Sequence, residues 1–370
     1  MGKASQREAA VVEAPVDGVA VADPATRRAL SGLRMPLIGL PLAGVVLGVP
    51  SVWLAMVGAG WIGVVVLGVC AAAFLFTAVL ALQVTGLWIG PAGRLLRAQP
   101  WRVASVKVFR PRRGVLPKAR LLVRAEGEEP VHLLAPLLPW AAQQVLARTG
   151  KIWLVGPDAQ GWVAIRSAGL VLPLGQARVS PAGFTDEVEI DVAQTAPVRI
   201  PLASGDAVLS RVISAPRKRS RTDLVTPILL LVFAGIVLVD LLNRGIKADQ
   251  VGLAVGVFAG TLAIVGLLAW RVRRLRFWLQ VDRHLADGPW TSVPVELPDL
   301  TEARRETVAG RATLPGGREV SVTLPRAGHA LRANITETGT LWTAGTPAAG
   351  KRAVVGIPGY PFVALANFGE

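Results

Sequence analysis

The hydrophobic positions of the chain fall into four long runs that are arranged as two pairs. A helix needs roughly 20 apolar residues to cross a hydrocarbon core about 30 Å thick. The four runs reach this length without an internal Lys or Arg, and they cover residues 35–57, 61–88, 224–242 and 251–270. Because the connection within each pair is short, its two members should be antiparallel neighbours. The pattern therefore predicts four transmembrane helices in two hairpins.

Shorter apolar stretches with alternating polar positions follow each hairpin and predict small β-rich domains. After the first hairpin, the expected strands cover residues 103–109, 119–125, 131–134, 152–155, 162–165 and 170–172, with a helix-like stretch at 137–147. After the second hairpin, they cover residues 318–324, 341–344, 353–357 and 362–364. A length of about 75 residues suits a small closed barrel or a sandwich, and the pattern does not choose between them.

The chain repeats itself at a constant offset of 189, which is the difference in number between Trp101 and Trp290. The same offset places residues 150–156 (GKIWLVG) on residues 339–345 (GTLWTAG). We interpret this match as a tandem internal duplication of hairpin and β domain. The anchors of the repeat are Trp101, Trp153, Gly156, Trp290, Trp342 and Gly345. The Trp side chains are expected to fill the domain cores or rest on the membrane surface, with ligand or peptide recognition as the alternative.

These patterns define the fold class as an α+β membrane protein, in which each hairpin precedes a small cytoplasmic β-rich domain. The six expected segments are a disordered cytoplasmic tail (1–33), a first hairpin (34–90), a first β module (91–175), a connector (176–222), a second hairpin (223–271) and a second β module (272–370). Each copy crosses the membrane twice, so the copies share one orientation. They therefore differ from the inverted repeats of many transporters.

Positive charge is concentrated beside the apolar runs, in a chain whose formal net charge is +15. Basic residues near span ends mark the cytoplasmic side, and this places both termini and both β modules in the cytoplasm. The same residues are expected to contact anionic lipid headgroups. The strongest clusters are Arg217, Lys218, Arg219 and Arg221 before the third span, and Arg271, Arg273, Arg274 and Arg276 after the fourth. Since the charge follows the spans, we expect membrane lipids and no nucleic acid as its partner.

Small residues recur inside two of the predicted spans and indicate close helix packing. Glycines at such spacings let helix backbones approach one another. The residues concerned are Gly44, Gly48, Gly252, Gly256 and Gly260. They favour a packed four-helix bundle or a homo-oligomer over glycines that are merely tolerated in lipid.

The residues that usually carry catalysis or bind metals do not form a recognisable site. The one cysteine, Cys70, lies inside an apolar run and has no second thiol with which to form an intramolecular disulfide. The three histidines are not spaced as metal ligands, and they are His132, His284 and His329. No nucleophile elbow, Walker loop or dinucleotide-binding motif is present. We therefore expect a non-enzymatic protein with no cofactor and no metal.

Two further motifs have ordinary explanations. The acidic run at residues 186–191 could bind a cation or a basic partner, but a solvated strand edge is the preferred interpretation. Asn334, Ile335 and Thr336 match a glycosylation sequon, which would be silent on the cytoplasmic side.

The Ala/Val/Gly/Arg-rich composition, with Pro-Trp followed by Gly-x-Ile/Leu-Trp-x-x-Gly, resembles uncharacterised multi-pass membrane proteins of high-GC Gram-positive (actinobacterial) type. The resemblance covers residues 34–370. It implies a bacterial cytoplasmic (inner) membrane and carries no activity and no functional residues.

The leading hypothesis is a non-enzymatic integral membrane scaffold or adaptor. Its duplicated β modules would bind a protein partner or the inner membrane surface. One alternative is an oligomeric channel or transport accessory protein, whose marker would be a polar stripe along the pore. Another is an enzyme with an unrecognised site, which matched acids or nucleophiles in a cleft between the modules would favour.

Overall fold

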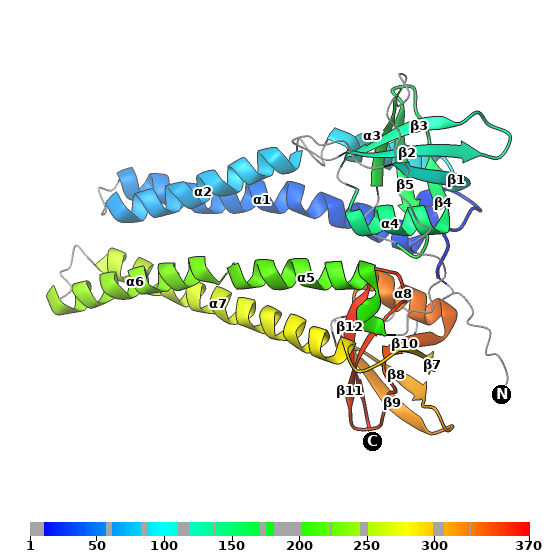
Figure 1. The fold of residues 1–370 in the computed structure, drawn as a ribbon. Coiled ribbons are helices and arrows are strands. Elements are labelled where there is room, and N and C mark those ends of the chain that lie inside the picture. Colours follow the sequence, from blue (N-terminus) through cyan, green and yellow to red (C-terminus); the bar gives the residue numbers. More distant parts are fainter. Residues whose placement is uncertain are drawn as a thin grey trace. The chain divides into compact units, whose positions relative to one another are not determined.

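The protein is described by a computed structural model that covers residues 11–56, 61–82, 87–109, 118–136, 138–170, 175–180, 202–222, 224–244, 251–298, 307–325 and 327–370. The chain divides into two compact units (Figure 1). The barrel unit comprises residues 1–30, 90–213 and 280–370, and the helical unit comprises residues 31–89 and 214–279. The barrel unit contains the strands, and the helical unit consists of helices.

Six antiparallel strands in the barrel unit close into a first β-barrel with the order β1-β2-β3-β6-β5-β4, in which β4 pairs back onto β1. The strands are β1 (Arg102–Phe109), β2 (Lys118–Ala125), β3 (Val131–Pro136), β4 (Lys151–Val155), β5 (Trp162–Ser167) and β6 (Gly175–Val179). Helix α4 (Trp140–Thr149) lies between β3 and β4 in the chain. It ends at Gly150, whose left-handed backbone (φ 61°) is the usual helix stop.

Alternation of side chains explains why these segments form a barrel. In β1, Ala104, Val106 and Val108 are buried while Ser105 and Lys107 are exposed. Successive residues of a strand point to opposite faces, so one face of the sheet is apolar and must be covered. Closure covers that face from the other side of the barrel and also leaves no unpaired strand edge.

A second barrel has the same strand order, in which β7, β8, β9, β12, β11 and β10 occupy the places of β1, β2, β3, β6, β5 and β4. Its elements are β7 (Trp290–Glu296), β8 (Thr307–Thr313), β9 (Glu319–Pro325), α8 (His329–Thr338), β10 (Thr340–Ala344), β11 (Arg352–Gly356) and β12 (Val363–Phe368). Helices α4 and α8, like strands β4 and β10, are related by the repeat offset at both of their ends. The prediction of two β modules is confirmed, and both are closed barrels rather than sandwiches.

The last strand of the first barrel differs from the prediction. A strand was expected at residues 170–172 and a connector from residue 176, whereas β6 occupies Gly175–Val179. Leu170 is buried but lies in a loop. Its apolar character reflects burial against the core and not strand structure. Strands β7 and β8 were not predicted. In β8, Gly310 and Arg311 interrupt the apolar alternation.

Long helices make up most of the helical unit. They are α1 (Pro24–Met56), α2 (Trp61–Ala81), α3 (Leu87–Ala98), α5 (Ala207–Thr222), α6 (Val225–Arg244) and α7 (Val251–Leu285). Two of them, α1 and α5, begin in the barrel unit. Helix α1 begins within the stretch that was predicted as a disordered tail, and α5 lies within the predicted connector. Both starts follow an aspartate, Asp23 or Asp206, whose side chain accepts backbone hydrogen bonds of the first turn.

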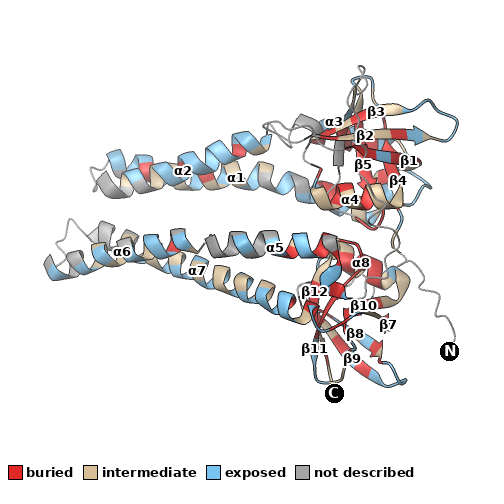
Figure 2. Ribbon diagram, in the orientation of Figure 1, coloured by how far each residue is buried: buried red, intermediate tan, exposed pale blue. Residues whose placement is uncertain are grey.

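The helices of the helical unit expose large apolar side chains, whereas buried residues concentrate in the barrels (Figure 2). Ile38, Phe76, Ile236 and Phe258 are each more than half exposed. Among the described residues, one helical stretch, Pro24–Trp53, is long and apolar enough to cross a membrane. Two shorter apolar stretches are Leu67–Ala81 and Pro227–Val239. The number of spans therefore stays a prediction.

Helices α1 and α2 approach closely where their residues are small. A Cβ on Gly44 would lie 2.8 Å from the Leu75 side chain, and one on Gly48 would lie 3.6 Å from the Ala71 Cβ. Nearby, the Ser51 hydroxyl donates a 2.8 Å hydrogen bond to the Val64 carbonyl oxygen. Close backbone approach of this kind is typical of packed helices in lipid.

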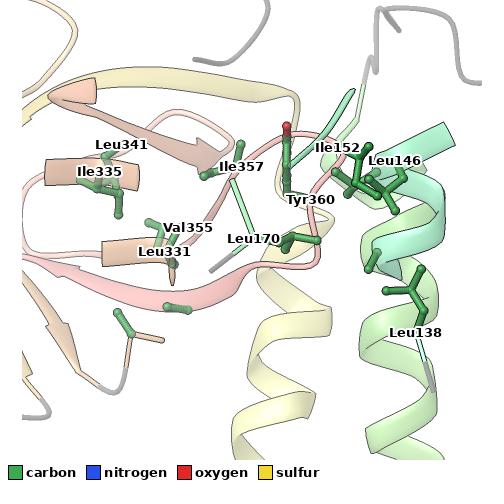
Figure 3. Packing of buried hydrophobic residues seen from close by; sticks show 14 of the residues in the cluster. Leu138, Leu146, Ile152, Leu170, Leu331, Ile335, Leu341, Val355, Ile357 and Tyr360 are labelled. Atoms are coloured by element: carbon green, nitrogen blue, oxygen red, sulfur yellow. The ribbon is translucent and has the colours of Figure 1, made fainter. Parts of the chain in front are cut away.

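One cluster of buried hydrophobic residues takes members from both barrels (Figure 3). Leu146 and Ile152 belong to the first barrel, and Leu331 and Val355 belong to the second. Truncating such a side chain to Ala typically costs about 2–5 kcal/mol. Much of the stability of the barrel unit should therefore reside in this cluster.

Gly310 should be essential to the seam between β7 and β8. A Cβ at this position would run into the backbone oxygen of Glu296. We expect Gly310→Ala to destabilise the protein by about 1–3 kcal/mol, as overpacking usually does. Thermal unfolding in detergent would measure the loss. Gly328→Ala is the matched control, since no atom lies within 4 Å of its added Cβ, and equal midpoints for the two variants would contradict the prediction.

Candidate functional site

Buried polar side chains gather where the two barrels meet the first turns of α1 and α5. The group includes Thr26, Arg166, Asp206 and Asn334, each at most 2% exposed. A buried polar group costs free energy unless it is hydrogen-bonded. Such a group therefore specifies one arrangement of the segments that it joins. We call this region the barrel junction.

The carboxylate of Asp23 joins α1 to the first barrel. Its Oδ2 lies 2.7 Å from Nη1 of Arg166 in β5, and the pair is nearly fully buried. The same carboxylate accepts hydrogen bonds from the Thr26 hydroxyl at 2.7 Å and from the backbone N–H groups of Ala25 and Thr26 at 3.1 Å. The Trp101 indole in turn donates to the Thr26 hydroxyl at 3.2 Å. One carboxylate thus caps the helix and attaches it to the barrel wall.

Two opposing effects set the charge state of Asp23. Burial raises the pKa of this carboxyl, but the Thr26 hydroxyl, the Arg166 guanidinium and the two backbone N–H groups outweigh it, so the pKa lies below its ordinary value. Burial also lowers the pKa of Arg166, which the charge of Asp23 opposes. Arginine nevertheless remains protonated in proteins, so the pair is ionic at neutral pH.

Asp206 has the corresponding position at the start of α5 but a different set of partners. Its Oδ1 accepts the N–H groups of Val208 (2.9 Å) and Leu209 (3.1 Å), and its Oδ2 accepts that of Gly359 (2.5 Å) in the loop after β11. Burial raises the pKa of Asp206, and these hydrogen bonds together with the charge of Arg148 offset the rise only in part. This carboxyl therefore reduces stability as the pH rises from its unfolded pKa through its higher folded pKa.

The turn before each helix is bound in the same way. In the first half, the Ala20 N–H donates to the Gln99 carbonyl at 2.9 Å, and in the second half Ala203 donates to Gly288 at 3.0 Å. Gln99 and Gly288 are related by the repeat offset, whereas Ala20 and Ala203 lie closer together in number than that offset requires. The segment from this turn to the residue that it binds is therefore longer in the second half (203–288) than in the first (20–99). The repeat offset does not extend through the whole of the two hairpins.

Asn334 in α8 bridges the second barrel to the N-terminal segment and to the first barrel. Its Oδ1 accepts the Val12 N–H at 2.8 Å, and its Nδ2 donates to the Gly169 carbonyl at 3.0 Å. Gly169 also donates its N–H to the Val12 carbonyl at 3.0 Å. The amide thus holds three separate parts of the chain together. In the sequence, this residue was interpreted only as part of a silent glycosylation sequon.

Aromatic contacts complete the junction between the barrels. The guanidinium carbon of Arg148 in α4 lies 4.7 Å from the ring centre of Tyr360, which stacks on Phe362 with ring centres 5.9 Å apart. A Cβ on Gly359 would overlap the Arg148 guanidinium, and the positive φ of Gly359 (75°) also favours glycine. Arg211 of α5 lies 4.2 Å from the ring centre of Trp140 at the start of α4. Cation–π contacts of this kind are each worth about 0.5–2 kcal/mol.

A histidine lies close to the start of α1. Nη1 of Arg28 lies 2.5 Å from Nε2 of His329, the first residue of α8. Burial lowers the pKa of His329, the positive charges of Arg28 and Arg332 lower it further, and Asp23 opposes them. The imidazole is therefore neutral at neutral pH, with Nε2 free to accept the Arg28 hydrogen bond.

The predicted repeat anchors occupy the barrel walls. Trp101 and Trp153 are 1% exposed, and Trp290 and Trp342 are half-buried. Gly156 and Gly345 both have positive φ, at 105° and 76°, and their N–H groups bond to Gln99 Oε1 and to the Pro289 carbonyl oxygen. These residues lie beside the first strand of each barrel and form part of the barrel wall.

The predicted lipid-contact residues lie on two helices. Arg217, Lys218, Arg219 and Arg221 are in α5, where Lys218 is exposed and the other three side chains lie outside the described part. Arg271, Arg273, Arg274 and Arg276 are in α7. There, the guanidinium carbons of Arg271 and Arg274 lie 5.2 Å and 5.7 Å from the ring centre of Trp270.

The predicted packing glycines have different surroundings. Gly44 and Gly48 face α2, whereas no atom lies within 4 Å of a Cβ placed on Gly260. Gly252 and Gly256 are in α7, but their surroundings are not described. The acidic run at 186–191 also falls outside the described residues. Within the described ranges, no three His, Cys, Asp or Glu side chains are grouped as a metal site.

No protein-family model, curated protein or solved structure matches the chain. Its function must therefore be inferred from its own residues.

Removing Arg166 should be far more damaging than removing an exposed partner of an ion pair. Arg166→Ala leaves the Asp23 charge buried without its counter-ion, which typically costs about 3–5 kcal/mol. Lys151→Ala is the control, because the Lys151–Glu13 pair is 3.7 Å apart and mostly exposed, and such pairs contribute about 0–1 kcal/mol. Chemical unfolding of both variants measures the difference, and similar losses would contradict a central role for Arg166.

The contribution of Asp23 should depend on pH. Because its folded pKa is lowered, the carboxylate stabilises the protein above the unfolded pKa of about 3.9, and this contribution is lost as the pH falls through the folded pKa. The stability difference between wild type and Asp23→Asn should thus be full at pH 7 and shrink below about pH 4. Unfolding midpoints across this range test it. Asp17→Asn, at an exposed position, should show no such trend, and a constant difference for Asp23→Asn would rule out the assignment.

Proposed function

We propose that the chain is an integral membrane scaffold, with four spans in two hairpins and two cytoplasmic barrels that present one joined surface to a protein partner. The two halves arose by tandem duplication in this proposal. The observation that carries it is the contrast between the two units. Apolar side chains are buried in the barrel unit, where the buried side chains of Arg166 and Asn334 are hydrogen-bonded, whereas the helical unit exposes its apolar side chains.

The exposed apolar side chains of the helical unit are unfavourable in water and need an apolar environment around them. Monomeric soluble proteins rarely expose continuous apolar patches larger than a few hundred Å². Helices α1, α2, α6 and α7 all carry exposed Val, Leu, Ile or Phe along their length. Lipid chains satisfy such a surface, and Trp270 with the adjacent Arg271 and Arg274 has the character of a membrane-interface anchor.

The barrel junction supports the scaffold part of the proposal. Each barrel binds the start of the helix that leads into its own hairpin, through Asp23 in one half and Asp206 in the other. Asn334 and Arg148 join the barrels to each other. An assembly held by buried polar contacts can keep two surfaces in register for a partner, which independent domains on flexible linkers cannot do.

Single-cysteine variants test the topology. In a Cys70→Ala background, Ala59→Cys lies in the predicted loop of the first hairpin, while Glu126→Cys and Glu319→Cys are exposed on the two barrels. We expect a membrane-impermeant maleimide to label Ala59→Cys in intact cells and the barrel variants only after permeabilisation. Labelling of either barrel in intact cells would refute the cytoplasmic orientation.

The same variants test the scaffold itself. A thiol-attached photocrosslinker at Glu126→Cys or Glu319→Cys should yield a discrete adduct with another protein in living cells. The Ala59→Cys variant provides the matched control and should yield none with that protein. If neither barrel position forms an adduct while topology is as proposed, the membrane placement stands and the scaffold function falls.

A further inference from the structure

A pocket of about 390 Å³ opens on the second barrel, between the loop that joins β10 to β11 and the segment after α7. Ala344, Ala353 and Phe368 supply apolar lining, and Asp287, Lys351 and Arg352 supply charge. Small-molecule sites usually have volumes of about 300–1,000 Å³ and combine apolar walls with a few polar groups. The pocket therefore has the size of a ligand site, and the surface that it offers to a ligand is more polar than apolar.

The two cationic side chains of the pocket are available to a ligand. Lys351 and Arg352 are exposed, and within the described part of the chain neither side chain forms an ion pair or a hydrogen bond. Asp287, by contrast, is engaged by Nδ1 of His284 at 2.9 Å. Adjacent cations repel one another, so a concave site with two of them favours an anion.

The backbone of the loop does not form the phosphate cradle of nucleotide-binding proteins. Gly345, Gly350 and Lys351 have the spacing of such a motif, but strand β11 follows instead of a helix. The N–H groups of these three residues are also committed, because they donate to the carbonyl oxygens of Pro289, Phe368 and Ala348. Recognition must therefore come from the side chains.

The first barrel lacks the basic pair and provides an internal comparison, since the cation at this loop, Arg178, is held over the Trp162 ring at 5.5 Å. At the repeat offset, Lys351 and Arg352 correspond to Trp162 and Val163. There, the Asp158 carboxylate accepts the N–H groups of Gln160 and Trp162 at 3.0 Å and 2.8 Å and closes the loop on itself. The same barrel thus folds without a basic pair at this place, so the pair in the second barrel is not needed for the fold.

We propose that this pocket binds a phosphate group, with Lys351 and Arg352 as its recognition residues. Lysine contributes a mobile point charge, and arginine contributes a planar fork of N–H donors that suits phosphate oxygens. A tetrahedral phosphate offers acceptor oxygens to both side chains at once. The remainder of the ligand contacts the loop residues Thr346 and Ala348, because Phe368 and Ala353 are almost fully buried. A soluble phosphate ester and a phospholipid headgroup share this chemistry, and the site goes beyond the scaffold function because it does not depend on a protein partner.

The test uses full-length protein in uncharged detergent and three probes: inorganic phosphate, glycerol phosphate and a short-chain phosphatidylglycerol. ³¹P line broadening during titration reports binding. We expect saturable binding of at least one probe, and Lys351→Gln combined with Arg352→Gln should weaken it about tenfold or more, equivalent to about 1.4 kcal/mol. Binding of a soluble probe identifies a soluble ligand, and binding of the lipid alone identifies a headgroup.

Arg311→Gln combined with Arg318→Gln is the matched control, because it removes the same charge from exposed positions of the same barrel. It should change the affinity less than twofold. An equal loss in both double variants would show diffuse attraction to a basic protein and overturn the proposal. Absence of saturable binding for all three probes would overturn it as well. Neither result bears on the membrane topology, which the cysteine variants test separately.

Discussion

The ion pair between Asp23 and Arg166 is the interaction on which the arrangement of the first half depends. Moving a carboxylate and a guanidinium out of water costs several kcal/mol for each ion, and their attraction repays it only with good geometry and further hydrogen bonds. Both conditions are met here. The carboxylate has four donors around it, and two of them are the backbone N–H groups that the first turn of α1 leaves unpaired. The start of the helix and the wall of the barrel therefore form together or not at all.

The second half fixes the start of its helix with fewer charged groups. Among the described residues, Asp206 has no buried arginine at bonding distance, and it relies on the Gly359 N–H instead. The charge that assists it, Arg148, comes from the other barrel, and Arg211 of α5 also reaches that barrel through Trp140. Both helix starts also contact the other barrel, α1 through Arg28 and His329, and α5 through Arg211 and Trp140. The two halves therefore have the same fold but bind the starts of their helices with different groups, a buried arginine in the first half and a backbone N–H in the second.

Local signals in the sequence explain which elements could be predicted. Clear alternation marked β2, and the recurrence at the repeat offset marked the common positions of α4 and α8. The start of α1 was also accessible, because Asp23 followed by Pro24 is a strong helix-start signal. The prediction followed the apolar run instead and placed the start of this helix at residue 35. Strand β8 was missed because Gly310 serves close packing against β7 rather than the apolar pattern.

The candidate site was less accessible, because its contacts join residues that are distant in the sequence. Arg166 lies 143 residues after Asp23 and sits in a strand whose other residues are mostly apolar. Nothing local distinguishes an arginine with a buried partner from one on the surface. The repeat gave little help, because among the described residues Asp206 reproduces the backbone hydrogen bonds of Asp23 but not its bond to a buried arginine, and Asn334 corresponds to Val145 at the repeat offset.

The bond between Val12 and Asn334 spans 322 residues, and this separation orders events during synthesis. Val12 leaves the ribosome 322 residues before its partner. Domains generally fold as units in the order of their synthesis, and distant contacts close late because of their loop entropy. The Val12 N–H must therefore wait for its final partner while the intervening residues are made. Before α8 is made, this segment can already bond to the first barrel through the Gly169 N–H and the Val12 carbonyl oxygen, whereas the Asn334 amide that joins it to the second barrel is still absent.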